Sequence, residues 1–449
     1  MSTAFLAGLV IFGVALLLIQ IAVFRIHAFI ALLVTSMAVA VVGGVPLADV
    51  ATEIQQGMGT TLGYIAVVIG VGAIFGELLQ RSGGAEEIAR HLLSRFGEKR
   101  APLALGLTGL VVAIPVFFDV AFILLVPLIY SLTRRTNRPI LYYAIPLAAG
   151  IAVAHSFIPP TPGPVAVAGL LGADLGWVIV FGTVAGVPAT VIGGIYFGRF
   201  IATRITVGIP DFAIDDEPDE KGADIIRPTF LTAVVLVLLP LALILCGTVS
   251  TVMLPEEHSV RGFLTFLGHP FTALVLTVLI SFYLIGTRCG FSAIEVREMA
   301  TKSLEPVGMI ILVTGAGGVL GKVLIASGVG EAVATLVAGS SAPVVLLGFL
   351  IAAGVRVAQG SATVSMVTAA GLLTPVIEVS DVGGITLALS TVAIASGATV
   401  LSHVNDSGFW LVGRYLGLSE RDTFRSWTVM ETLVGLVGLG VALALSAVI

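Results

Sequence analysis

The sequence predicts an all-α polytopic membrane protein made of two inverted-topology repeats, each with about five transmembrane helices and one re-entrant hairpin. Three observations predict it: long apolar runs, an internal repeat, and interruptions at matching places in both halves. Hydrophobic residues make up 57% of the 449 residues and charged residues only 11%, whereas soluble proteins carry about 25% charged residues. Many uncharged runs reach the roughly 20 residues that span a bilayer. We interpret the first run as a retained span and not as a signal peptide.

The composition also argues against several other classes of protein. Two cysteines, Cys246 and Cys289, imply neither a disulfide framework nor a metal site. The net charge of −5 is local to residues 205–227, where seven acidic residues face only Lys221 and Arg227. The sequence contains no basic patch for nucleic acid. We therefore expect the lipid bilayer to be a partner and nucleic acid not to be one.

One glycine-rich stretch occurs twice. Residues 69–89 (IGVGAIFGELLQRSGGAEEIA) return as residues 314–334 (TGAGGVLGKVLIASGVGEAVA), without any insertion. In a membrane protein such glycines favour close helix packing over ligand contact. GVGAIFG is not a dinucleotide loop, because a membrane span offers no strand before it. The shared positions are Gly70, Gly72, Gly76, Leu79, Ser82, Gly83, Glu86 and Ala89, which match Gly315, Gly317, Gly321, Leu324, Ser327, Gly328, Glu331 and Ala334.

The first repeat, residues 1–204, contains two interrupted segments. Residues 102–133 are too long for one span and too short for two, and IPVFFD breaks them in the middle. Basic residues flank this run on both sides and should stay cytoplasmic, so a re-entrant hairpin is expected. Four prolines then unwind a helix over about 155–164, because proline removes backbone donors. The other elements are spans at about 4–24, 28–45, 60–79, 140–171 and 177–198, a polar turn at Asp49 and Glu53, and an amphipathic surface helix at 81–100.

An acidic cytoplasmic linker, residues 205–227, leads to the second repeat, residues 228–449, which follows the same order. Its long run at about 343–377 predicts the second hairpin, and SHVNDSG unwinds a helix at about 402–408. Five spans per half is an odd number, so the two glycine-rich stretches should cross the membrane in opposite directions, with both chain termini outside. The expected spans lie at about 230–249, 269–286, 307–322, 383–416 and 428–448.

Two charged residues stand at the predicted hairpin tips. Asp119 is the only charge in its apolar run, and an intramembrane carboxylate suggests a proton or cation site. Its alternative role is to cap the second half-helix. Arg356 stands at the matching tip and could bind a ligand carboxylate through two nitrogens. Its alternative role is a structural ion pair with Asp119 or Asp406.

Polar residues surround these charges in the sequence. Gln359, Ser361 and Thr363 suit ligand hydroxyls, although Ser and Thr in membrane helices often bond their own backbone. Histidines occur at equivalent places in the two unwound stretches, without the spacing of a metal site. No catalytic residue and no metal ligand is expected. The candidates for substrate binding are Arg356, Gln359, Ser361, Ser156, Thr161 and Asn405, and those for proton coupling are Asp119, Asp406, His155 and His403.

Five motifs together resemble the gluconate permease (GntP) family over essentially the whole chain. They are GxGxxFGxxLxxSGGA at 70–85, IPVFFDVAFILLVPL at 114–128, HSFIPPTPGP at 155–164, GSATVSMVTAAG at 360–371 and SHVNDSGFW at 402–410. The resemblance implies a multi-pass protein of the bacterial inner membrane that imports gluconate or a related sugar acid by proton symport. Some members take up D-serine. The chain is also similar to the wider ion transporter superfamily, whose members are typically homodimers with two opposed re-entrant hairpins and an elevator-like motion.

We therefore expect a proton-coupled importer of a small hydroxylated monocarboxylate, without a cofactor. The alternative is a symporter of the same fold that is coupled to sodium or takes another substrate, such as D-serine or a dicarboxylic acid. An ion channel is disfavoured because channel pores usually come from symmetric oligomers, whereas the two predicted tips differ. An enzyme is disfavoured because the sequence offers no nucleophile motif.

Overall fold

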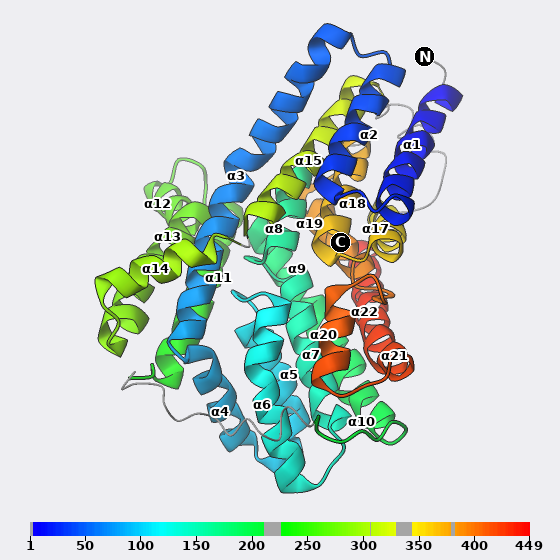
Figure 1. Ribbon diagram of the computed structural model, residues 1–449. Coiled ribbons are helices and arrows are strands. Elements are labelled where there is room, and N and C mark those ends of the chain that lie inside the picture. The colour runs from blue at the N-terminus through cyan, green and yellow to red at the C-terminus, as the bar shows by residue number, and fades with distance from the viewer. Residues whose placement is uncertain (1–2, 211–225, 306, 329–343, 379–381) are drawn as a thin grey trace.

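The computed structural model describes residues 3–210, 226–305, 307–328, 344–378 and 382–449, and this part of the chain forms helices and connecting segments without a strand. Seven of the described helices are long and apolar enough to cross a membrane. Figure 1 shows an elongated bundle, with α1, α2 and α15 towards one end and α4, α5 and α6 towards the other. The acidic linker falls largely outside the described residues, as do Glu331 and Ala334 of the second glycine-rich stretch.

The N-terminal part agrees with the predicted spans except at one turn. Asp49 and Glu53 were expected in a polar turn, but they lie in the first turns of a single 35-residue helix, α3. The prediction was wrong because polarity was taken to end the helix, whereas an acidic side chain near a helix N-terminus is stabilised by the helix dipole. The helices are α1 (Thr3–Leu18), η1 (Ile19–Val23), α2 (Ala28–Val42), α3 (Leu47–Arg81) and the surface helix α4 (Gly84–Phe96).

The two interruptions predicted in the first half are both present as breaks between helices. Residues 113–117 separate α5 (Ala101–Val112) from α6 (Phe118–Thr136), and residues 158–161 separate α7 (Leu141–Phe157) from α8 (Pro162–Leu171). Prolines stand in both breaks, where the missing N–H ends the helical hydrogen bonding. The returning span consists of α9 (Leu175–Ala189), η3 (Thr190–Tyr196) and α10 (Phe197–Ala202).

The second half contains matching breaks. Gly360 and Ser361 separate α17 from α18, and residues 398–406 separate α19 from α20. Three helices, α12, α14 and the short α21, lie where no helix was expected. The helices are α11 (Phe230–Met253), α12 (Ser259–Gly268), α13 (Pro270–Ser281), η5 (Phe282–Gly286), η6 (Thr287–Cys289), α14 (Ala293–Ser303), α15 (Val307–Ala326), α17 (Val344–Gln359), α18 (Ala362–Glu378), α19 (Gly384–Gly397), α20 (Ser407–Tyr415), α21 (Glu420–Thr423), η7 (Phe424–Thr428) and α22 (Val429–Ser446).

The two glycine-rich stretches lie on neighbouring helices. The glycines of α3 and α15 allow the two backbones to approach closely, as Gly57 does against Val319. Further along α3, Gly70 lies beside Leu304, just before α15 begins. Contacts therefore move backward along α15 as they move forward along α3, so the two helices are antiparallel (Figure 1). The contacts of these glycines are with helix and loop atoms, as the packing interpretation requires.

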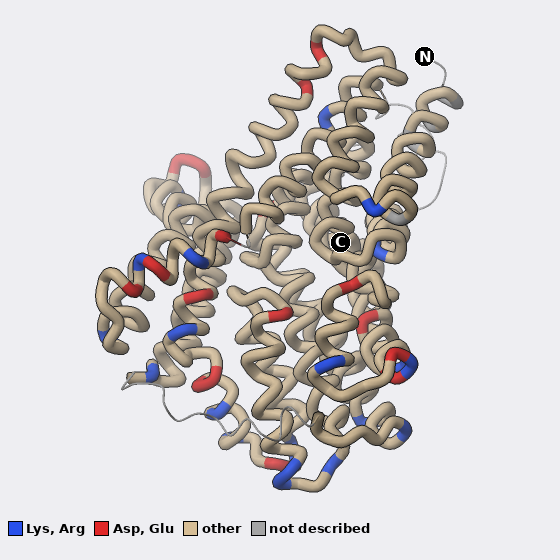
Figure 2. Tube along the Cα trace, viewed as in Figure 1, with Lys and Arg blue, Asp and Glu red and all other residues tan. Residues whose placement is uncertain are grey.

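Charged residues are distributed unevenly along the bundle. Figure 2 shows many Lys and Arg residues at the end of the molecule that contains α4, α10 and the end of α6, and few near the opposite end. Large apolar side chains remain exposed on the flanks of the bundle, among them Ile11, Leu231 and Phe263. This combination of an apolar flank and a basic end is typical of a membrane protein that follows the positive-inside rule.

Candidate functional site

Three of the four breaks, at 113–117, 360–361 and 398–406, contribute to one cavity of about 410 Å³, together with the end of α7 before the fourth break. A volume of about 300 to 1,000 Å³ is usual for a small-molecule site. Its walls come from both halves of the chain and include most of the polar residues singled out in the sequence. The lining residues are Phe117, Phe118, Asp119, Ala152, His155, Ser156, Met309, Ile310, Val313, Arg356, Gln359, Gly360, Ser361, Ala362, Thr363, Val364, Asn405, Asp406, Ser407, Gly408, Trp427 and Glu431.

Gly360 explains how two of these breaks come together. It adopts a φ of +91°, a conformation that L side chains rarely adopt. A Cβ at this position would also overlap the backbone carbonyl of Asn405. Two nearby bonds join the same segments, because the Asn405 Nδ2 and the His403 ring Nε2 each lie 3.0 Å from the carbonyl oxygen of Val357. The end of α17 is thereby held against the segment between α19 and α20.

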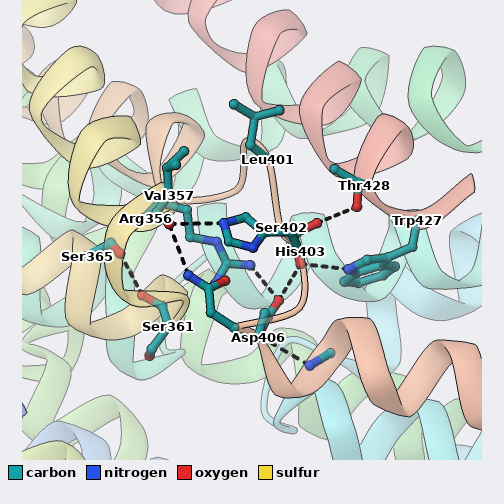
Figure 3. Close-up of polar contacts among 12 residues, drawn as sticks. Arg356, Val357, Ser361, Ser365, Leu401, Ser402, His403, Asp406, Trp427 and Thr428 are labelled. Atoms are coloured by element: carbon teal, nitrogen blue, oxygen red, sulfur yellow. Dashed lines mark hydrogen bonds and ion pairs between the residues drawn. The ribbon is translucent and has the colours of Figure 1, made fainter. Parts of the chain in front are cut away.

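Arg356 and Asp406 form an ion pair between these two breaks. The Arg356 Nη2 lies 2.6 Å from Asp406 Oδ2, and the Arg356 side chain is only 3% exposed. Asp406 also accepts hydrogen bonds from the Ser402 hydroxyl at 2.5 Å and from the backbone N–H of Gly408 at 3.2 Å, which caps α20. The carboxylate is thus fully engaged. Figure 3 shows the guanidinium directed at Asp406.

The guanidinium keeps unused hydrogen-bonding capacity. Its Nε and Nη1 atoms are buried and have no hydrogen-bond partner among the described residues. A buried donor without a partner costs roughly 1–3 kcal/mol, and more for a charged group. Because Arg356 lines the cavity, a ligand carboxylate could take up one of these two donors, which point to opposite sides of the guanidinium. The ion pair that the sequence offered as an alternative to ligand binding is present, and it leaves room for the ligand.

Hydroxyl and amide groups lie around this cation. Gln359 donates from its Nε2 to the Ser361 carbonyl at 2.5 Å and to the Ser365 hydroxyl at 2.8 Å. The Ser402 hydroxyl accepts a bond from the Trp427 indole at 2.7 Å, and its carbonyl accepts one from the Thr428 hydroxyl (Figure 3). These bonds fix the loop before α20. The site therefore combines a rigid cationic corner with polar side chains that can reorient towards a hydroxylated ligand.

Comparisons with known proteins place the whole chain in one family. The sequence model of the GntP family permeases matches residues 6–449. The chain belongs to this family of permeases. It is 41% identical to the low-affinity gluconate transporter of Escherichia coli K12, over 98% of this chain and 97% of that protein. It is 36% identical to a gluconate permease of Pseudomonas aeruginosa, over 96% of each chain. These relatives are named as transporters and not as enzymes.

A solved structure supports the fold of this permease. The chain matches MtrF of Neisseria gonorrhoeae, described as illuminating a class of antimetabolite efflux pumps, with a TM-score of 0.69. That match covers 95% of this chain and 96% of the other at 14% sequence identity. Such low identity carries the fold alone. Together with its apolar helices, the comparisons establish a multi-pass membrane transporter related to gluconate permeases.

Not every predicted site residue reaches the cavity. Thr161 donates its hydroxyl to the Ile158 carbonyl at 2.7 Å and lines a separate void of only about 10 Å³. His403 bonds the Val357 carbonyl and is not among the residues that line the cavity. Asp119 does line it, in the first turn of α6, and no side chain caps that helix. The capping role considered for Asp119 is therefore absent from this structure.

Sequence reasoning missed Glu431 and Trp427, which both line the cavity. Glu431 lies in α22 and is the only charged residue of that helix. The signal that singled out Asp119, an isolated carboxylate in an apolar run, was present here too. Trp427 gave no such signal, because its role depends on the bond to Ser402, a residue far from it in the sequence.

Proposed function

We propose that this permease imports gluconate, or a closely related small hydroxylated monocarboxylate, by proton symport. The observation that carries the proposal is the unsatisfied guanidinium of Arg356 in the wall of a cavity of about 410 Å³. A planar guanidinium suits a carboxylate, which it can bind through both oxygens along the edge that Nη2 forms with Nε or with Nη1. The names of the relatives agree with a sugar acid as substrate.

The proposed pose places the substrate carboxylate on one edge of the Arg356 guanidinium, formed by the second N–H of Nη2 together with Nε or with Nη1. The hydroxylated part of the substrate then lies among Ser156, Gln359, Ser361 and Asn405, which line the same cavity. Hydroxyls give such a site its selectivity, because polar groups left without a partner on binding the wrong ligand cost affinity. A dicarboxylate would need a second cation, and Arg356 is the one Lys or Arg among the lining residues of the described chain.

Proton coupling requires a carboxylate that can change its protonation state at the site. Asp119 and Asp406 are the candidates predicted from the sequence, and both line the cavity together with His155. If Asp119→Asn still accumulated substrate fully under a proton gradient, Asp119 would have no coupling role.

The movement that we propose is elevator-like. The segments 101–136 and 344–378 act as two opposed re-entrant hairpins, related by an inverted repeat that includes α3 and α15. The antiparallel packing of these two helices supports this arrangement. We further propose a homodimer in the bacterial inner membrane, in which each protomer carries its own cavity.

Uptake of labelled gluconate into proteoliposomes, with an inward proton gradient and no sodium, tests the function. We expect accumulation that a protonophore abolishes. Uptake only after sodium is supplied would mean that sodium, and not the proton, is the coupling ion, while gluconate would remain the substrate. Uptake of D-serine or another acid in place of gluconate would mean that the proposed substrate is wrong and that the proposed class of transporter is right.

A further inference from the structure

Glu431 is a buried carboxylate that makes no hydrogen bond with the site residues described so far. Its side chain is 4% exposed, and its Oε1 is buried without a hydrogen-bond partner in the described part of the chain. It nevertheless lines the cavity that contains Arg356. Two glycines on the same helix hold α22 in place, because Gly435 lies against the carbonyl of Ser396 and Gly438 against the ring of Phe157. The backbone of α22 is therefore closely packed along the turns that follow Glu431.

The charges that face Glu431 come from few elements. Arg356 of α17 and Asp406 before α20 are the charged groups whose fields reach it. Among the other elements packed against α22, α19 and α9 carry no titratable residue, and α7 brings His155 to the cavity wall. Tyr196 of η3 is 62% exposed, and the Arg425 side chain of η7 is 50% exposed, so both lie towards the outside. Arg356 is thus the only cation close to Glu431 in the described structure.

That cation is already shared. Arg356 donates one N–H of Nη2 to Asp406, and in the proposed pose it gives the other, with Nε or Nη1, to the substrate. With substrate bound, the cavity would contain the carboxylates of Asp119, Asp406, Glu431 and the substrate around a single guanidinium. A buried ionised carboxylate without a compensating partner is strongly unfavourable. One or more of these groups must then take up a proton when the substrate binds.

The burial of each carboxyl group decides which one takes up the proton. Asp119 is exposed to the cavity, where water can solvate its charge. Asp406 accepts three hydrogen bonds that stabilise its ionised form, including the one from Arg356. Glu431 is almost completely buried, and its Oε1 has no donor among the described residues. Its charged form therefore depends most on the field of Arg356, and a substrate carboxylate bound there weakens that field.

We propose that Glu431 carries the coupling proton. This inference rests on the proposed function and assigns its central step. In the proposed cycle Glu431 is ionised only after release of its proton to the inner solution, when the site is empty and Arg356 is the one Lys or Arg in the described cavity wall. A proton from the outer solution neutralises it, and the guanidinium can then accept the substrate carboxylate. Proton and substrate leave together on the inner side, after which ionised Glu431 again faces Arg356. Because the two carboxylates compete for one cation, substrate binding and protonation are linked.

The substitution Glu431→Gln separates coupling from binding, because it mimics the protonated acid. In proteoliposomes we expect wild-type protein to accumulate gluconate under a proton gradient, and Glu431→Gln to lose at least about 90% of this accumulation. The variant should retain counterflow, the exchange of labelled for unlabelled gluconate at equal pH. The matched control is Glu77→Gln, the same change at a residue that pairs with Arg81 outside the cavity, and it should retain both activities.

The other outcomes would overturn either the coupling role of Glu431 or the proposed function. Accumulation by Glu431→Gln at the wild-type level would overturn the assignment and leave the proposed function intact. Loss of counterflow as well would also overturn it, because Glu431 would then serve binding or movement. Failure of wild-type protein to accumulate gluconate under a proton gradient would instead remove the proposed function, and the coupling role with it.

A second measurement does not depend on a folded variant. Addition of gluconate to purified wild-type protein in weakly buffered detergent solution should cause uptake of about one proton per bound substrate, followed with a pH indicator. If Glu431→Gln does not give monodisperse protein, Glu431→Asp replaces it and should retain this proton uptake. Absence of proton uptake by the wild type would overturn the proposal. Loss of uptake in Asp119→Asn with retention in Glu431→Gln would move the proton to Asp119.

Discussion

At the scale of single residues, the site depends on how one guanidinium divides its donors. Arg356 pairs with Asp406 through Nη2 and leaves Nε and Nη1 for the cavity. A lysine ammonium at the same place is a compact charge on a flexible stem and cannot reproduce this fork. It could hold either Asp406 or the substrate carboxylate well, but not both in the same geometry. The identity of this side chain therefore matters more than its charge.

We predict that Arg356→Lys weakens gluconate binding by about tenfold or more, because a hydrogen bond to a charged group contributes about 1.5–3 kcal/mol. Isothermal titration calorimetry of purified protein in detergent would measure the change in affinity. The control is Arg261→Lys, the same substitution at an arginine that bonds the Leu254 carbonyl outside the cavity. Unchanged affinity in Arg356→Lys would mean that no two-nitrogen carboxylate contact exists at this residue.

At the scale of the elements, glycines determine how closely helices approach the breaks. Gly76 of α3 lies against the Pro115 carbonyl in the break between α5 and α6, and an added Cβ would overlap that oxygen. Its counterpart Gly321 lies against Gly371 of α18, where a Cβ would be 3.2 Å from the carbonyl oxygen. In both repeats, the glycine-rich helix thus supports one of the interrupted segments. The two contacts are not identical, and the sequences of the two interrupted segments also differ.

We predict that Gly76→Ala lowers the stability of the purified protein by about 1–3 kcal/mol, the usual cost of overpacking a filled interior. Gly63→Ala is the matched control on the same helix, because nothing lies within 4 Å of its added Cβ. That variant should be neutral or stabilised by up to about 1 kcal/mol, since alanine is the better helix former. Thermal unfolding in detergent measures both, and equal midpoints for the two variants would contradict the packing role of Gly76.

At the scale of the whole molecule, we propose that the repeat relates two halves of opposite orientation. Arg81 at the end of α3 corresponds in the sequence repeat to Ala326 at the end of α15. The two helices are antiparallel, so these ends should lie on opposite sides of the membrane. The basic end of the bundle in Figure 2 should face the cytoplasm.

We predict that an impermeant maleimide labels Arg81→Cys only from the cytoplasmic side and Ala326→Cys only from the outside. Both positions are exposed, and the background replaces Cys246 and Cys289 by serine so that neither native thiol reacts. Right-side-out and inside-out vesicles give the two measurements. Labelling of both cysteines from the same side would rule out the inverted repeat.

Several site residues could be predicted because the membrane makes polar groups conspicuous. Asp119 and Arg356 stood out as charges in apolar runs, Asp406 was chosen for its place in an unwound stretch, and the cavity contains all three. Glu431 carried the same signal and was overlooked. Thr161 and His403 were chosen for their place in unwound stretches, yet the structure directs them to backbone carbonyls. Position in an irregular segment does not determine which way a side chain points.

The sequence by itself determined the membrane class, the two repeats, the interrupted helices and the family. These follow from local properties: hydropathy over about 20 residues, proline and glycine at breaks, and identity between stretches. Only the tertiary structure decided that three of the breaks contribute to one cavity, that Arg356 is paired with Asp406 while keeping two free donors, and that Glu431 is buried in the wall of the same cavity. These facts depend on distances between residues far apart in the chain, which are set by helix packing and carry no local signal.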